Sequence, residues 1–153
     1  MSTAYATLAE LKTRLGDELY AQLSDLSGGT TPSDTVGQAR LDDAHGYVNA
    51  RLSARYLTPI DTTGNSTLAE MLRAFVCAVV AHDLLAMHGD AMNNLRPGVD
   101  TRLRYWIDLL RDIQSGKAAL PGAAPLPSPT SGGPTSEAFG DERVFTSDSM
   151  KGF

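Results

Sequence analysis

The sequence predicts an all-α fold, a small bundle of about five helices followed by a long extended arm rich in proline and glycine. Apolar residues recur at helical spacing in successive segments, and no segment alternates between apolar and polar residues as a half-buried strand would. Of the 64 residues in the hydrophobic set, 52 lie at positions 1–116 and 12 at positions 117–153. Five of the eight prolines lie between positions 121 and 134. The helical core is therefore expected in the first part of the chain.

The first two predicted helices are short. Thr7 and Glu10 have the spacing of a capping box, and Gly16 ends the helix that follows. A second helix is predicted over residues 17–26, before a segment of turn-forming residues. The apolar faces consist of Leu8, Leu11 and Leu15 in the first helix and of Leu19, Tyr20, Leu23 and Leu26 in the second.

The third predicted helix begins near Ser33 or Asp34 and continues toward Tyr56. Pro59 stops it, because proline lacks the N–H that a helix interior needs. One face of this helix is apolar over several turns, which is typical of a helix packed against a core. That face consists of Val36, Leu41, Ala44, Tyr47, Val48 and Leu52.

The fourth predicted helix is the expected centre of the bundle. Thr67 and Glu70 have the spacing of a second capping box, and the helix continues to about His88. Residues 74–81 are apolar all round, which indicates a helix that other helices surround. This run is far shorter than the roughly 20 apolar residues that cross a bilayer, so we interpret it as core.

The last predicted helix covers residues 100–115, and Gly116 terminates it. Its apolar residues share one face, whereas its charged residues lie largely on the other face. The apolar face consists of Leu103, Trp106, Ile107, Leu110 and Ile113, and the charged residues include Asp108, Arg111 and Asp112.

These patterns divide the chain into a helical body (1–116), a linker rich in Pro, Gly and Ser (117–136) and a C-terminal docking arm (137–153). The arm holds three of the four phenylalanines, whereas disordered tails are usually poor in aromatic residues. A segment of this length cannot build its own core. We therefore expect its phenylalanine rings to dock on the body or on another chain.

Charge and cysteine content narrow the class of protein. The chain carries 13 Lys and Arg against 18 Asp and Glu, a net charge of -5, and shows no basic face that would favour nucleic acid. Cys77 is the single cysteine and lies in the apolar run, so we expect a buried, inert thiol. No secretory signal opens the sequence, which favours synthesis in a reducing cell interior.

Common catalytic motifs, namely HExxH, CxxC, GxSxG and the Walker loop, are missing from the sequence. In one respect the chain resembles the HD-type metal phosphohydrolases, which carry the order His, His-Asp, Asp. The matching residues are His45, His82 with Asp83, and either Asp100 or Asp108. In that family a helical bundle brings such side chains onto a metal that activates water. Because residues that would hold a phosphate are not conspicuous, we favour structural roles and expect no enzyme, no metal and no cofactor.

The densest pattern in the sequence is DAxxYVxxxLxxRYxxP, from Asp43 to Pro59. Asp43 and Arg55 lie about 18 Å apart along a helix, so each needs a different partner. In a structural interpretation Arg55 bonds helix carbonyls, Tyr56 packs and Pro59 sets the exit turn. In a functional interpretation the pattern forms a contact between subunits.

This pattern resembles a family of small Mu-like tailed-phage proteins that are encoded among the head and tail morphogenesis genes. The opening Tyr5-Ala6-Thr7 with Leu11, and the closing residues 144–145 and 149–153, are similar to the same family. The resemblance implies an α-helical head-tail connector, also called an adaptor or head-completion protein, which forms a ring of about twelve copies beneath the portal and carries no catalysis. The scaffold positions that it implies are Asp43, Arg55, Tyr56 and Pro59.

The resemblance also implies partners and a location. The partners are the portal protein, other copies of the chain and a tail-side neck or tail terminator protein, while DNA passes through the ring without sequence-specific binding. The protein would be made in the host cytoplasm and reside in the neck of the virion, away from any membrane. The arm would contact the portal or neighbouring subunits through Phe139, Val144, Phe145, Met150, Lys151 and Phe153.

Two other functions remain open from the sequence. One is the HD-type metal-dependent phosphohydrolase, and the other is a helical regulatory module that binds another protein through its tail.

Overall fold

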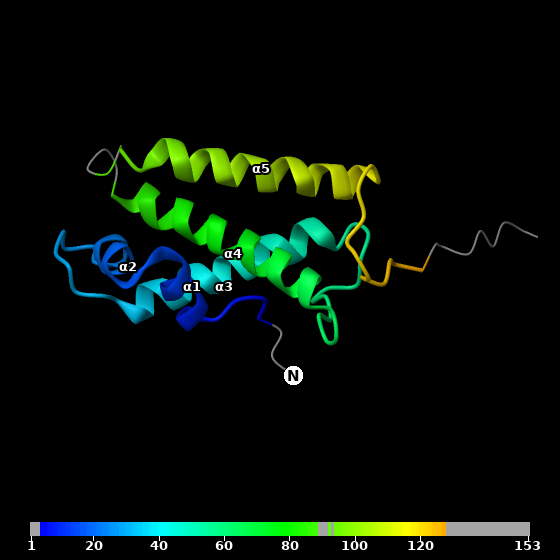
Figure 1. Ribbon diagram of the computed structural model, residues 1–153, viewed down its shortest axis with the longest axis horizontal. Coiled ribbons are helices and arrows are strands. Elements are labelled where there is room, and N and C mark those ends of the chain that lie inside the picture. The colour runs from blue at the N-terminus through cyan, green and yellow to red at the C-terminus, as the bar shows by residue number, and fades with distance from the viewer. Residues whose placement is uncertain (1–3, 89–91, 93, 128–153) are drawn as a thin grey trace, which may run out of the picture.

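The computed structural model describes residues 4–88, 92 and 94–127, and within them the chain forms a bundle of five α-helices. Figure 1 shows α4 crossing the middle of the bundle, with α5 along one side of it and α1, α2 and α3 on the other. The described part contains no strand, and its one isolated β-bridge joins Tyr56 to Pro125. The predicted all-α class is therefore confirmed. The helices are α1 (Leu8–Leu15), α2 (Asp17–Ser24), α3 (Asp34–Leu52), α4 (Ser66–Met87) and α5 (Arg96–Ser115).

The ends of α1 follow the predicted local chemistry. The Thr7 hydroxyl accepts a hydrogen bond from the Glu10 backbone N–H, and the Glu10 carboxylate accepts one from the Thr7 N–H at 2.8 Å. This is the predicted capping box. At the other end Gly16, with φ of 84°, provides a backbone conformation that residues with a side chain rarely adopt.

Two helices end earlier than predicted. The Asp25 carboxylate accepts hydrogen bonds from the N–H groups of Ser27 and Thr31, and this turn stops α2 at Ser24. Leu26 consequently lies outside the helix with 57% of its surface exposed, so its assignment to the apolar face was wrong. The third helix ends at Leu52 rather than near Tyr56, because residues 53–55 form a turn.

Two helices begin earlier than predicted. Asn65 caps α4 by accepting a hydrogen bond from the Leu68 N–H at 3.0 Å, so the predicted capping box of Thr67 and Glu70 is wrong. The fifth helix begins at Arg96 instead of residue 100. Proline at position 97 fits the first turn, where its missing N–H is not needed.

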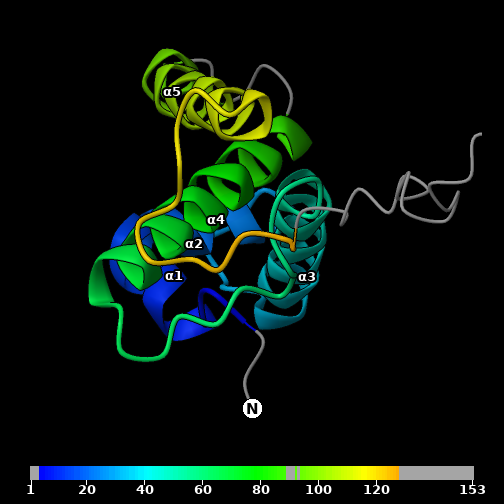
Figure 2. The same cartoon turned by 90° about the vertical axis from the view of Figure 1, so that its right-hand side faces the viewer.

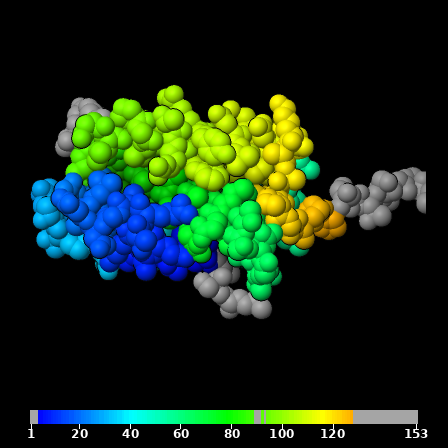
Figure 3. Space-filling view, in the orientation of Figure 1, coloured from blue at the N-terminus to red at the C-terminus, as the bar shows by residue number. Residues whose placement is uncertain are grey.

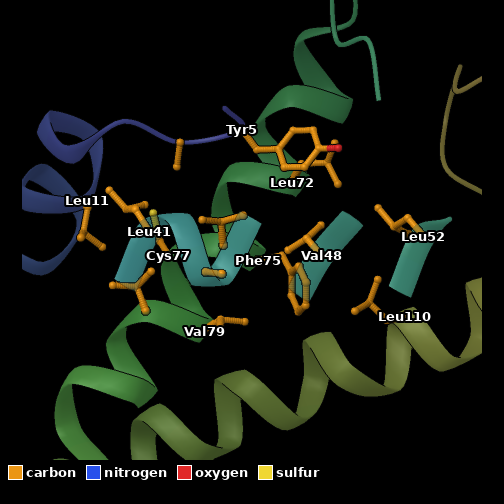
Figure 4. Packing of buried hydrophobic residues seen from close by; sticks show 14 of the residues in the cluster. Tyr5, Leu11, Leu41, Val48, Leu52, Leu72, Phe75, Cys77, Val79 and Leu110 are labelled. Carbon is orange, nitrogen blue, oxygen red and sulfur yellow. The ribbon is translucent and has the colours of Figure 1, made fainter. Parts of the chain in front are cut away.

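The predicted central role of α4 is confirmed. It contains eleven buried residues, from Leu68 to Leu85. In Figure 4, Phe75, Cys77 and Val79 of α4 lie in one cluster with side chains of α3. One apolar core thus joins the helices.

Residues 117–127, the first part of the predicted linker, leave α5 and cross the end of the bundle toward α3 (Figure 2). Leu120 is buried in the core, with 4% of its surface exposed. This segment therefore lies on the body, with a turn at Pro121 and Gly122, and Pro127 is the last residue described.

Candidate functional site

Arg55 and Tyr56 hold the chain where it leaves α5. The Arg55 guanidinium donates a hydrogen bond to the carbonyl oxygen of Ile113 at 3.3 Å, in the last turn of α5. The carbonyl oxygen of Arg55 accepts one from the Leu126 N–H at 2.7 Å. Tyr56 is buried, and its hydroxyl accepts one from the Leu120 N–H at 3.0 Å. We call this set of bonds the 55–56 junction.

Gly116 ends α5 and turns the chain toward the 55–56 junction. Its φ is 82°, in the left-handed region. A Cβ at this position would also collide with the Arg55 guanidinium. The backbone conformation therefore favours glycine here, and a side chain would in addition displace the Arg55 guanidinium.

The other two predicted scaffold positions lie elsewhere. Asp43 forms an ion pair with Arg40, one turn earlier on α3, at 3.0 Å; the Asp43 side chain is exposed and that of Arg40 is partly buried. Pro59 is exposed and follows a cis peptide bond from Thr58. The four residues of the pattern thus do not form one cluster, since only Arg55 and Tyr56 share a contact region.

Tyr5 attaches the start of the chain to the same end of the bundle. Its hydroxyl donates a hydrogen bond to the Asn49 side-chain oxygen at 2.5 Å and accepts one from the Ile60 N–H at 2.8 Å. Burial raises the pKa of Tyr5. This buried, doubly bonded tyrosine joins residues 4–7, α3 and the segment after Pro59 into one unit.

His45, a candidate metal ligand, has a structural partner. Its Nε2 atom accepts a hydrogen bond from the Ala6 N–H at 3.2 Å, and its ring lies edge-on against Tyr5 with 5.9 Å between centroids. Burial lowers the pKa of His45, which favours the neutral imidazole that this bond requires.

Of the remaining candidate metal ligands, some lie close to one another and one does not. His82 lies 3.4 Å from the Asp83 carboxylate and 3.7 Å from that of Asp100 on α5. Asp108 instead pairs with Arg111 at 3.2 Å. Among the residues that the structure describes, no group of three or more His, Cys, Asp or Glu side chains could hold a metal ion.

A groove of about 640 Å³ lies between the α1–α2 pair and the first half of α5, and we call it the α5 groove. Figure 3 shows this face, with α4 recessed between the blue α1–α2 region and the yellow-green α5. Its lining is mostly apolar and contains no acidic side chain. Lining residues include Leu15, Leu19, Leu23, Ala78, Val99 and Trp106.

The α5 groove was not predicted from the sequence. Its signal is a run of small residues on one face of α4, Ala74, Cys77, Ala78 and Ala81, before Leu85 on the same face, where a central helix normally carries large residues. Cys77 lies at this face, and burial raises the pKa of its thiol to about 11. This pKa agrees with the predicted inert thiol.

The predicted contact residues of the arm lie outside the described residues. They are Phe139, Val144, Phe145, Met150, Lys151 and Phe153.

Comparison with known proteins identifies the family. The family model described as Bacteriophage Mu, Gp36 matches residues 5–138, which include the helical bundle, the 55–56 junction and the linker. No curated protein matches the chain. None of the helices in the described part of the chain is long and apolar enough to cross a membrane. Because the match covers most of the 153 residues, the chain belongs to the Bacteriophage Mu Gp36 family of phage proteins.

Proposed function

We propose that this protein is a head-tail connector, which forms a ring beneath the portal of a Mu-like phage and joins the capsid to the tail. It acts as a structural protein of the virion neck and catalyses no reaction. The observation that carries this proposal is the family match over residues 5–138. The portal, a tail-side neck or terminator protein and other copies of the chain are its proposed partners.

The 55–56 junction supports this function because it fixes the point from which the C-terminal segment departs. Phe139 lies twelve positions after Pro127. At about 3.1 Å per residue, an extended proline-rich segment of this length spans about 37 Å. A body with a fixed exit can therefore present its phenylalanines to a surface well beyond its own edge.

A ring makes weak docking by such segments durable. Each phenylalanine that leaves water contributes about 25 cal/mol per Å² of apolar surface buried. Once one segment of a ring is bound, the next binds at a raised effective concentration. The net charge of -5 also fits a ring through which DNA passes without sequence-specific binding.

Deletion of residues 137–153 tests this function in the phage. We expect purified particles to lack the deleted protein and untailed heads to accumulate, as measured by mass spectrometry and electron microscopy. The purified deletion protein should keep the helical circular dichroism of the full chain, because the core lies within residues 5–120.

His82→Ala is the control, because His82 belongs to the alternative phosphohydrolase site and is far in sequence from the arm. We expect this variant to enter particles and support tail joining normally. The opposite pattern, with normal incorporation of the deletion protein and loss of function in His82→Ala, would refute the connector function and favour a hydrolase.

A further inference from the structure

The α5 groove is an apolar surface that the described chain leaves uncovered. Trp106 is half-buried at its wall, and the neighbouring Tyr105 has 63% of its surface exposed. Its volume of about 640 Å³ falls within the range of roughly 300–1,000 Å³ that is typical of ligand sites. A groove of this size accommodates aromatic side chains, each of which buries about 150–250 Å².

The charged side chains that line the groove are positive. Its lining contains two cations, Arg14 and Arg102, and no acidic side chain. Arg14 forms an ion pair with Glu70 at 3.0 Å, whereas Arg102 forms no ion pair with any residue that the structure describes. An occupant should therefore combine apolar rings with negative charge.

Residues 137–153 have this combination. The segment contains three phenylalanines, four acidic residues and two basic ones, which gives it a net charge of -2. Asp141 and Glu142 lie just before Phe145, and Asp148 lies just after it. Its rings match the apolar lining, and its carboxylates match the guanidinium of Arg102.

The course of the chain favours a groove on another copy. The Leu126 N–H is bonded to the Arg55 carbonyl, so the chain ends its described course beside α3. In Figure 2 this end lies on the α3 side of α4, whereas α1, α2 and α5, which border the groove, lie toward the other side. The described course of the chain thus ends away from its own groove.

We propose that the α5 groove binds residues 137–153 of a neighbouring copy of the chain, with Phe145 among the lining residues and an acidic side chain at Arg102. The contact is head-to-tail, because the two partners use different surfaces, and a repeated contact of this kind closes into a ring when the rotation permits. This inference rests on the proposed connector function, to which it adds the acceptor site between subunits.

Photochemical cross-linking of the full chain tests the inference. Phe145→p-benzoylphenylalanine places the reactive group in the arm, and a mixture of ¹⁵N-labelled and unlabelled protein distinguishes contacts between chains from contacts within one. We expect cross-linked peptides of mixed isotopic composition that join position 145 to residues 14–23 or 95–106. Leu57→p-benzoylphenylalanine is the control, because Leu57 is 63% exposed and does not line the groove.

A charge reversal in the groove provides a second measurement. Arg102→Glu should lower the yield of the cross-link from position 145 about fivefold, since it opposes the acidic segment. Arg104→Glu is the matched control, because Arg104 is exposed on the same helix and does not line the groove, and it should leave the yield unchanged.

Three results would overturn the inference. Groove cross-links confined to single-isotope peptides would show that the segment binds its own body. A chain that sediments as a monomer and forms no groove cross-link would show that copies do not associate in this way. Cross-links in purified particles that join position 145 to the portal instead of the groove would also reject it, yet they would leave the connector function intact. Absence of the full-length protein from particles would instead refute the connector function.

Discussion

The two halves of α5 have the same kind of sequence but different surroundings. The second half carries both buried residues of the helix, Leu110 and Ile113, and the 55–56 junction holds its end. The first half has partly buried residues such as Val99 and Leu103, and it borders the α5 groove. The comparison teaches that an amphipathic stripe shows which face of a helix packs, while the neighbouring helices decide how much of its length is covered.

The largest difference between the two halves is expected from leucine truncation. Leu110→Ala should lower the free energy of unfolding by about 2–4 kcal/mol, because it leaves a cavity in the core. Leu103→Ala, in the half-buried first part of α5, should cost about 1 kcal/mol. Urea unfolding of both variants measures the two changes in the free energy of unfolding. Equal decreases would contradict the difference in burial between the two halves.

Removal of the Tyr56 hydroxyl tests the 55–56 junction. Tyr56→Phe leaves the buried Leu120 N–H without its acceptor, so the free energy of unfolding should fall by about 1–3 kcal/mol. Tyr105→Phe is the matched control, because Tyr105 is exposed on the first half of α5 and should change stability little. A null effect of Tyr56→Phe in thermal and urea unfolding would mean that the junction does not hold residues 117–127.

Replacing glycine by alanine should change the free energy of unfolding in opposite directions at the two ends of α5. Gly116→Ala should destabilise the protein by about 1–2 kcal/mol, since alanine resists the left-handed conformation and its methyl group displaces Arg55. Gly98→Ala should stabilise it by about 0.4–1 kcal/mol, because Gly98 is helical and nothing lies within 4 Å of an added Cβ. Differential scanning calorimetry should show a lower melting temperature for Gly116→Ala and a higher one for Gly98→Ala than for the wild type.

The smallest effect is a pH dependence at His45, which lies away from both halves of α5. Because burial lowers the pKa of His45 below its ordinary 6.5, the unfolded chain binds the proton first as the pH falls. The contribution of neutral His45 to stability is therefore complete above about pH 6.5 and declines as the pH drops toward 5.

His45→Gln isolates this contribution, since glutamine does not titrate. We expect the free energy of unfolding of the wild type to fall more between pH 7 and pH 5 than that of the variant. The lowered pKa values of Asp25 and Asp61 act only below their ordinary 3.8, so they do not disturb this comparison. Parallel pH profiles would show that His45 is not held neutral by burial.

Local chemistry made much of the fold predictable. The capping box at Thr7 and the terminating glycines at 16 and 116 depend on residues close in sequence, and all three were predicted correctly. The start of α4 was not, because Asn65 competed successfully with the Thr67 and Glu70 pair for the capping role. Asn is as good an N-cap residue as Thr, so the Thr67 and Glu70 spacing alone could not fix where the helix begins.

The candidate site was less predictable than the fold. The pattern from Asp43 to Pro59 drew attention to Arg55 and Tyr56, but their bonds reach Ile113, Leu120 and Leu126, far along the chain. Spacing alone cannot supply partners at such separations. For the same reason the sequence placed His45 and His82 in one hypothetical metal site, whereas the structure gives each a different neighbour.

By itself the sequence determined the helical class, the central position of α4 and the composition of the segments after Gly116, because these follow from periodicity, apolar content and proline placement. Only the tertiary structure decided that Arg55 and Tyr56 hold the exit of α5 and that the small residues of α4 form the floor of a groove. Both features arise where segments far apart in the sequence meet, and the gap between packed helices depends on the side chains that each neighbour contributes.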